Sequence, residues 1–126
     1  MDDRDHNELG TIRISDEAIG VIAGLAALEV KGVAAMAQGT VEGLAESLGI
    51  RPRHGRGVKV EVSEEEVFIE LNLLVEFGVD IPAVCQRVQD KVQETVEDMT
   101  GLTVARVNVS VQGVKNKADK APRVLR

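Results

Sequence analysis

The fold is decided by the stretch Val67–Val111, which reads VFIELNLLVEFGVDIPAVCQRVQDKVQETVEDMTGLTVARVNVSV. Its first part alternates apolar with polar or mixed residues as far as Phe77, which is typical of a strand with one face in the core. Asp80 and Pro82 then mark a helix start, because Asp is a favoured N-cap and Pro is tolerated in the first turn. The strand residues expected to line the core are Val67, Ile69, Leu71, Leu73, Val75 and Phe77.

A second helix-to-strand transition completes this stretch. The helix is predicted from Ile81 to Met99, and Gly101 follows it as a C-terminal stop. A last strand is predicted over Leu102–Gln112, where apolar and polar residues alternate again. The apolar stripe of the helix recurs every four residues, at Val84, Val88, Val92 and Val96.

The N-terminal half predicts a similar alternation of short strands and helices. A short strand is expected at Thr11–Ile14, and Ser15 then caps a helix whose first turn is acidic. Two glycines four residues apart on this helix indicate close packing against a sheet. A short strand over Val33–Ala37 and a short helix over Val41–Leu48 complete this half.

Between the halves, Val58–Val62 alternates like a strand and turns back into the Val67 strand, which predicts an antiparallel hairpin. Together the elements predict an α+β fold. It is a two-layer sandwich with a mostly antiparallel sheet of about four strands and two main helices on one face. The other face of the sheet is left open.

The amino-acid composition limits the classes of protein to which this chain can belong. The 126 residues hold two Phe, no Tyr and no Trp, so the core must be aliphatic. A single cysteine rules out an internal disulfide and fits a reducing compartment, and the acidic N-terminus is unlike a signal peptide. Residues 1–8 carry a net charge of −3 and residues 115–126 carry +4, which leaves −7 between them. We therefore expect a cytoplasmic protein with an acidic flexible tail (1–9), one α+β domain (10–113) and a basic flexible tail (114–126).

Candidate chemistry is sparse. Cys85 falls on or beside the valine stripe of the long helix and is interpreted as a small core residue, since no His lies near it in sequence. Neither His6 nor His54 belongs to a metal-ligand spacing. The sequence predicts no catalytic residue, no metal and no cofactor, and hence a protein that is not an enzyme. The best anion contact is the loop with Arg51, Arg53 and Arg56, although a mobile surface loop without an anion is the favoured interpretation.

The open sheet face is the candidate interaction surface. Phe68 and Leu74 are apolar residues among polar neighbours there, as at the centre of a protein interface with a polar rim. Alternatively, Phe68 packs beneath the tail or the 38–50 segment. An RNA-binding module is a second hypothesis, but such sheets stack bases on aromatics, and the body is acidic. The candidate interface residues are Phe68, Glu70, Asn72, Leu74, Arg106 and Asn108.

An ordered set of short blocks resembles one known family. The blocks are Gly10–Glu17 (GTIRISDE), Val30–Val33 (VKGV), Gly57–Val60 (GVKV), Glu76–Pro82 (EFGVDIP) and Val107–Val111 (VNVSV). They resemble the bacterial alkaline-shock or general-stress protein family, also called envelope stress response proteins, over about residues 10–113. Phe77 stands where the family pattern has Tyr.

The resemblance implies a small cytoplasmic protein without catalysis, and it carries over no site residue. Family members self-associate, some are held at the membrane by a separate anchoring partner, and some are linked to cell-envelope homeostasis or fatty-acid synthesis. The function expected is therefore that of a stress-response scaffold that contacts itself and other proteins, without inserting into a membrane. The alternatives are an RNA-binding module and a regulator of a fatty-acid synthesis enzyme.

Overall fold

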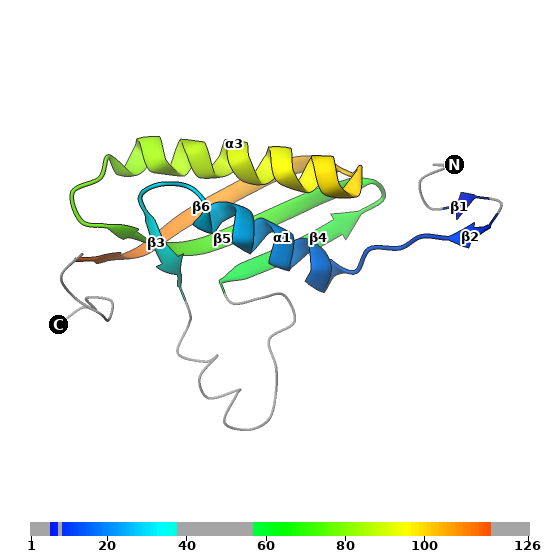
Figure 1. The fold of residues 1–126 in the computed structure, drawn as a ribbon, viewed down its shortest axis with the longest axis horizontal. Coiled ribbons are helices and arrows are strands. Elements are labelled where there is room, and N and C mark those ends of the chain that lie inside the picture. Colours follow the sequence, from blue (N-terminus) through cyan, green and yellow to red (C-terminus); the bar gives the residue numbers. More distant parts are fainter. Residues whose placement is uncertain (1–5, 8, 38–56, 117–126) are drawn as a thin grey trace, which may run out of the picture.

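The computed structural model describes residues 6–7, 9–37 and 57–116. Two helices lie on one face of a four-stranded sheet (Figure 1), which confirms the predicted two-layer α+β sandwich. Three strands pair with one common central strand, two of them antiparallel to it and one parallel. The elements are α1 (Asp16–Leu28), α3 (Ile81–Thr100), β3 (Val33–Met36), β4 (Val58–Ser63), β5 (Glu66–Glu76) and β6 (Thr103–Lys115).

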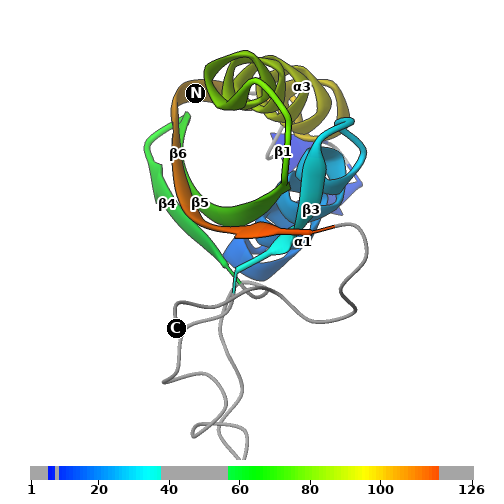
Figure 2. The ribbon, with the colours of Figure 1, turned by 90° about the vertical axis from the view of Figure 1, so that its left-hand side faces the viewer.

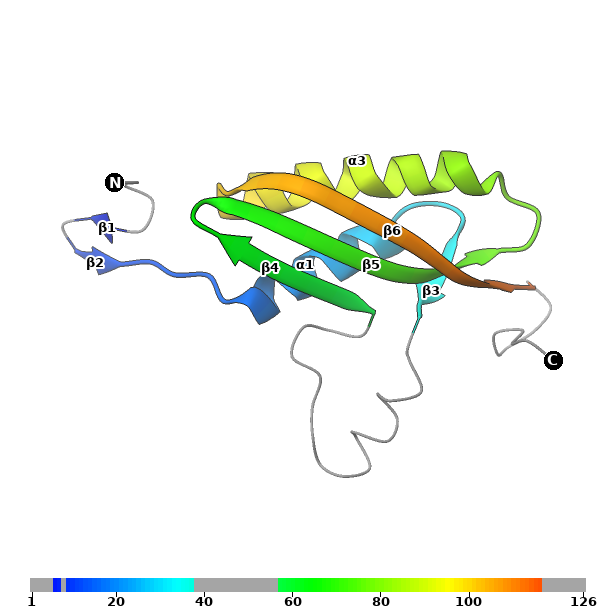
Figure 3. The same ribbon diagram turned by 180° about the vertical axis from the view of Figure 1, so that it is seen from behind.

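Strand β5 organises the whole sheet. β4 pairs antiparallel with its first half, from Ser63 opposite Glu66, and thus forms the predicted hairpin. β3 pairs antiparallel with its second half, on the same edge and end to end with β4. β6 pairs parallel with the opposite edge along its full length, with two bulges (Figure 3). Ala37, which follows β3, and Gly57, which precedes β4, are both hydrogen-bonded to Asn72 on this edge.

Both helices begin, and α3 ends, as their capping residues predict. The Ser15 hydroxyl accepts the N–H of Ala18 at 3.1 Å, and the Asp80 carboxylate accepts the N–H of Ala83 at 3.2 Å. Each bond satisfies one of the N–H groups that lack a partner in the first turn. Gly101 ends α3 in the left-handed region at φ 77°, which costs glycine little.

The core lies between the sheet and the helices and is aliphatic throughout. Five alternate residues of β5 and four valines of α3 are buried as predicted, and α1 adds Ile19 and several small residues. Small residues let α1 approach the sheet closely: a Cβ at Gly24 would lie 3.4 Å from Val58 Cγ2. The fully buried side chains from the sheet and α3 are Val67, Ile69, Leu71, Leu73, Val75, Val84, Val88, Val92 and Val96.

Three details of the prediction are wrong. Thr11–Ile14 is not a strand of the main sheet; only Thr11 is paired, in a two-strand ladder of β1 (His6–Asn7) and β2 (Gly10–Thr11). β5 cannot take that stretch as a partner, since β3, β4 and β6 already occupy its edges. Phe77 is 72% exposed rather than in the core, because β5 ends one residue before it. The last strand continues to Lys115, three residues beyond its expected end.

Two further predictions, the helix at Val41–Leu48 and the arginine loop at 51–57, fall outside the described residues except for Gly57. The ladder of β1 and β2 lies apart from the sandwich, at the end of an extended arm that leads to α1 (Figure 1, Figure 3). The N-terminal arm is defined here as residues 9–14.

Candidate protein-interaction surface

The open face of the sheet brings the predicted interface residues together. In the register of the three strands, Phe68 of β5 lies between Glu61 of β4 and Arg106 of β6. The next row places Glu70 between Lys59 and Asn108. Seen end-on, both helices lie on the opposite side of the sheet (Figure 2). In the part of the chain that the structure describes, this face therefore carries no covering helix.

A shallow hollow sits on these two rows. Its rim alternates in charge, with Lys59 and Arg106 against Glu61 and Glu70, and Phe68 lies among them half-buried. A protein surface with both signs of charge around an apolar centre favours contact with a protein more than with a polyanion. The lining residues are Lys59, Glu61, Phe68, Ile69, Glu70, Arg106 and Asn108.

Farther along the same face, one apolar side chain lies beside a group of three polar side chains. Leu74 is half-buried, and its side chain lies over Gly113: a Cβ there would come within 3.1 Å of Leu74 Cδ2. Beside it, the Gln112 amide donates to Ser110 Oγ at 3.0 Å and reaches Asn72 Oδ1 at 3.4 Å. The side chain of Leu74 thus lies against the backbone of the neighbouring strand β6.

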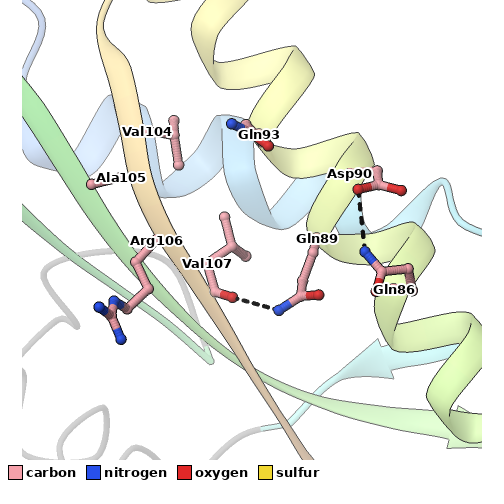
Figure 4. Close-up of a pocket in the computed structure, with 8 residues that line it drawn as sticks. All are labelled: Gln86, Gln89, Asp90, Gln93, Val104, Ala105, Arg106 and Val107. Carbon is pink, nitrogen blue, oxygen red and sulfur yellow. Dashed lines mark hydrogen bonds between the residues drawn. The ribbon is translucent and has the colours of Figure 1, made fainter.

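A different groove runs between α3 and the outer edge of β6 (Figure 4). Gln89 Nε2 donates to the carbonyl oxygen of Val107 at 2.9 Å, and Glu97 Oε2 accepts the N–H of Val104 at 2.9 Å. These side chains satisfy backbone groups on a sheet edge that would otherwise be open to a further strand. This role was not predicted from the sequence. Its signal was the four-residue spacing of Gln89, Gln93 and Glu97 beside the valine stripe.

Cys85 lies half-buried on the first turns of α3, next to the buried Val84. Burial raises the pKa of its thiol above the ordinary value, which lowers the fraction of the nucleophilic thiolate at neutral pH. This environment is that of a packing residue rather than of an activated nucleophile.

Among residues 6–7, 9–37 and 57–116, no three side chains of His, Cys, Asp or Glu come together as a cation site. The anion candidates Arg51, Arg53 and Arg56 lie outside the described residues. Neither α1 nor α3 has the length and apolar character needed to cross a membrane.

Comparison with known proteins identifies the family. Residues 4–116 match the model of the alkaline shock protein 23 (asp23) family, described by a cell envelope-related function. The chain belongs to this family, as the ordered blocks of the sequence predicted.

The relatives give further context. The chain is 38% identical over 113 residues to the uncharacterized protein YqhY of Bacillus subtilis (strain 168), covering 90% of this chain and 83% of that protein. It is 32% identical over 108 residues to a stress response regulator gls24 homolog of Streptococcus pyogenes serotype M3, covering 86% of this chain but only 60% of that protein. The family description thus concerns the cell envelope, and the stress response appears in the name of the streptococcal relative.

Solved structures show the fold alone. A zinc form of a MamM CTD variant matches 86% of this chain and 96% of its own with a TM-score of 0.51, at 13% sequence identity. A second zinc form, of another variant, matches 87% of this chain and 97% of its own with the same TM-score and identity. At this identity the likeness concerns the arrangement of helices and strands.

Proposed function

We propose that the protein is a non-enzymatic, cytoplasmic stress-response scaffold that serves cell-envelope homeostasis through contacts with other copies of itself and with partner proteins. The observation that carries this proposal is the open sheet face, on which Phe68 and Leu74 lie among polar and charged neighbours. Membership of a family with a cell envelope-related function supports the envelope part of the proposal.

The open face has the composition of an interface. An apolar centre contributes burial when a partner covers it, and a polar rim supplies orientation through hydrogen bonds and charge pairs. The two half-buried apolar residues are the centre here, and the rows of Lys59, Glu61 and Arg106 are the rim. Because the rim carries both signs of charge, a second copy can offer complementary charges when it is turned to face the first.

The same face argues against the RNA alternative. Sheets that bind single strands stack bases on aromatic side chains, and Phe68 is the only aromatic residue on this one. Residues 9–114 carry a charge of −7, which repels a phosphate backbone. We expect RNA binding to be weak and lost at physiological ionic strength. Micromolar binding of labelled single-stranded RNA that survives this salt would instead favour the RNA module.

The experiment on the scaffold proposal replaces Phe68 and Leu74 by Ser together. We expect the apparent mass in light scattering to fall while the helical circular dichroism stays unchanged. The matched control replaces Gln86 and Asp90 on the outer face of α3 by Ser, and it should keep the wild-type mass. A double variant with wild-type mass and wild-type recovery of partner proteins would contradict the role of the open face.

A further inference from the structure

Strand β6 lies at the edge of the main sheet, and its outer side is capped over only part of its length. It pairs with β5 on one side, and in the part of the chain that the structure describes no strand pairs with the other side. Two side chains of α3 bond to this outer side: Glu97 accepts the N–H of Val104, and Gln89 donates to the carbonyl oxygen of Val107 (Figure 4). Both caps lie in the first half of the strand. Among the described residues, no side chain caps the second half in this way.

The backbone groups of the second half alternate in direction. From Val107 to Val111 the strand pairs with β5 in continuous register, and successive residues of a strand turn their N–H and C=O groups to opposite sides. The Val107 carbonyl points away from β5, toward α3. The N–H and C=O groups of Val109 and Val111 therefore point away from β5 as well, and they are free to pair with a further strand.

The same direction continues beyond the bulge at Gln112. The carbonyl oxygen of Lys115 accepts the N–H of Phe77 at 3.0 Å, so Lys115 faces β5. Val114, one residue earlier, therefore faces outward. We name Val109–Val114 the open edge of β6.

The core-facing valines of β6 lose their cover along the same stretch. Val104 and Val107 are 5% and 8% exposed, whereas Val109, Val111 and Val114 are only partly buried. The reason is the path of the helix above them: β6 starts beside the C-terminal end of α3 and diverges from α3 toward its own C-terminal end (Figure 1, Figure 3). A strand added to the open edge would bury more of these three valines, and this burial favours its binding.

The charged side chains of β6 are all basic. The strand carries Arg106 and Lys115 and no acidic residue, whereas β4 and β5 each include glutamates. Arg106 projects from the side of β6 that faces away from α3 (Figure 4), and among the described residues it makes no ion pair. Opposite charges on neighbouring strands stabilise a sheet, and like charges destabilise it. The open edge therefore favours a strand that sets acidic side chains beside Arg106.

We infer that the open edge of β6 binds an extended, acidic segment of a partner protein as a fifth strand of the main sheet. The main-chain groups of this segment pair with the outward N–H and C=O groups of β6, as in other cases of strand addition. Its apolar residues, at alternate positions, pack beside Val109 and Val111. Its acidic residues lie between them and face Arg106 on the other side of the sheet. The inference rests on the proposed contacts with partner proteins and adds the chemistry of one such partner.

A second copy of β6 would not satisfy this edge. Two edge strands of identical chains can join in a symmetric pair. Since β6 has no acidic side chain, no register of such a pair offers Arg106 an opposite charge, and the basic residues of both copies would gather on one face. Like charges on neighbouring strands are destabilising, so the edge favours a different, acidic chain.

Two labelled peptides test the chemistry of the partner. The peptide EVEVEVE presents valines to the core side of the edge and glutamates to Arg106, and KVKVKVK has the same pattern with the opposite charge. In fluorescence polarisation at low ionic strength, we expect EVEVEVE to bind about tenfold more tightly or better. Because residues 9–114 carry a charge of −7, the overall charge favours the lysine peptide, so a preference for the glutamate peptide must come from local contacts. Equal binding of the two peptides, or tighter binding of KVKVKVK, would overturn the inference.

Variants of the strand test the site. Val109→Pro removes an N–H that points away from β5, and proline is tolerated at such an edge position. We expect it to weaken the binding of EVEVEVE about tenfold or more, while Val109→Ala, the matched control, keeps the N–H and should retain most of the affinity. Arg106→Glu leaves the backbone intact and should reverse the preference toward KVKVKVK, so it decides the outcome even if Val109→Pro does not fold. Wild-type preference in Arg106→Glu would contradict the inference.

Hydrogen exchange of the backbone amides locates the bound strand. Saturating EVEVEVE should slow the exchange of Val109 and Val111, whose N–H groups point outward. Ser110, whose N–H faces β5, is the internal reference and should change little. If Val109 and Val111 exchange as slowly as Ser110 in the protein alone, another copy or the rest of the chain already covers the edge, and the inference fails. It also fails if the peptide binds without slowing these two amides.

The open edge and the open sheet face fail separately. The variant with Phe68→Ser and Leu74→Ser keeps every residue of the open edge, so it should bind EVEVEVE nearly as the wild type does. Val109→Pro, in turn, should keep the wild-type mass in light scattering. If the open-face variant keeps the wild-type mass while EVEVEVE binds as expected, the open face fails and the edge stands. If that variant loses mass while EVEVEVE does not bind to the wild type, the edge fails and the open face stands.

Discussion

The backbone N–H of Asn72 donates to the carbonyl oxygen of Gly57 at 2.8 Å, and this bond marks the point where two strands meet on one edge. The carbonyl oxygen of Asn72 accepts the N–H of Ala37 at 2.8 Å on the same side. One residue of β5 therefore holds the end of β3 and the start of β4. Ala37 and Gly57, which are 20 positions apart in the sequence, therefore lie side by side at this junction.

Gly57 should not tolerate a side chain. It has φ +75°, and a Cβ there would lie 2.5 Å from the carbonyl oxygen of Ala37 and 2.8 Å from that of Asn72. Backbone strain in the left-handed region and displacement of these carbonyls together predict that Gly57→Ala lowers the free energy of unfolding by about 2–4 kcal/mol. Urea denaturation measures this. Gly78→Ala is the control: its φ is +96°, but its Cβ meets nothing within 4 Å, so a loss as large as that of Gly57→Ala would contradict the steric explanation.

Glu97 should protect the edge of β6. Removing the carboxylate in Glu97→Ala leaves the N–H of Val104 without its acceptor, at a predicted cost of about 1–2 kcal/mol. The amide of Val104 should then exchange faster with deuterium. Glu97→Gln retains a carbonyl oxygen and should keep most of the protection. Unchanged exchange at Val104 in the Ala variant would show that the bond does not hold this edge.

Val92 should report on the packing of α3 against the sheet. Its side chain is fully buried between valines one turn away on each side. Val92→Ala removes two methyl groups and leaves a cavity, so we expect a loss of about 2 kcal/mol in the free energy of unfolding. Met99→Ala, on an exposed position of the same helix, should change it by less than about 0.5 kcal/mol. Equal losses in the free energy of unfolding at both positions would contradict the expectation that the burial of Val92 sets the cost.

Cys85 should react slowly. Burial raises the pKa of its thiol in the folded protein, so at a pH near 8 the folded chain should label more slowly with a thiol reagent than the urea-unfolded chain does. Labelling of the folded protein should speed up only at higher pH. Folding favours the neutral thiol, so the thiol contributes a small stabilisation at pH values below the pKa that it has in the unfolded chain. This contribution is lost as the pH rises through the raised pKa of the folded chain. Rapid labelling at neutral pH would reopen a chemical role for Cys85.

Local patterns in the sequence were sufficient to predict most of the fold. Alternation along β5 and the four-residue repeat of α3 depend only on which side chains avoid water, so they predicted the buried faces correctly. Ser15, Asp80 and Gly101 act on backbone groups within one turn of their own helix, so the starts of both helices and the end of α3 were also predictable. The open-face residues followed from the same alternation, since every second residue of a strand points away from the core.

What the sequence by itself determined was thus the identity of α1, α3 and the four strands of the main sheet, and the buried side of β5 and of α3. Only the tertiary structure decided which edges those elements share. The parallel pairing of β6, the junction at Gly57 and Asn72, and the capping of β6 by Glu97 join residues far apart along the chain or on different elements. The exposure of Val21, Leu25 and Leu28 is of the same kind, because all sides of α1 are apolar and only its packing against α3, β3 and β4 decides which side remains uncovered.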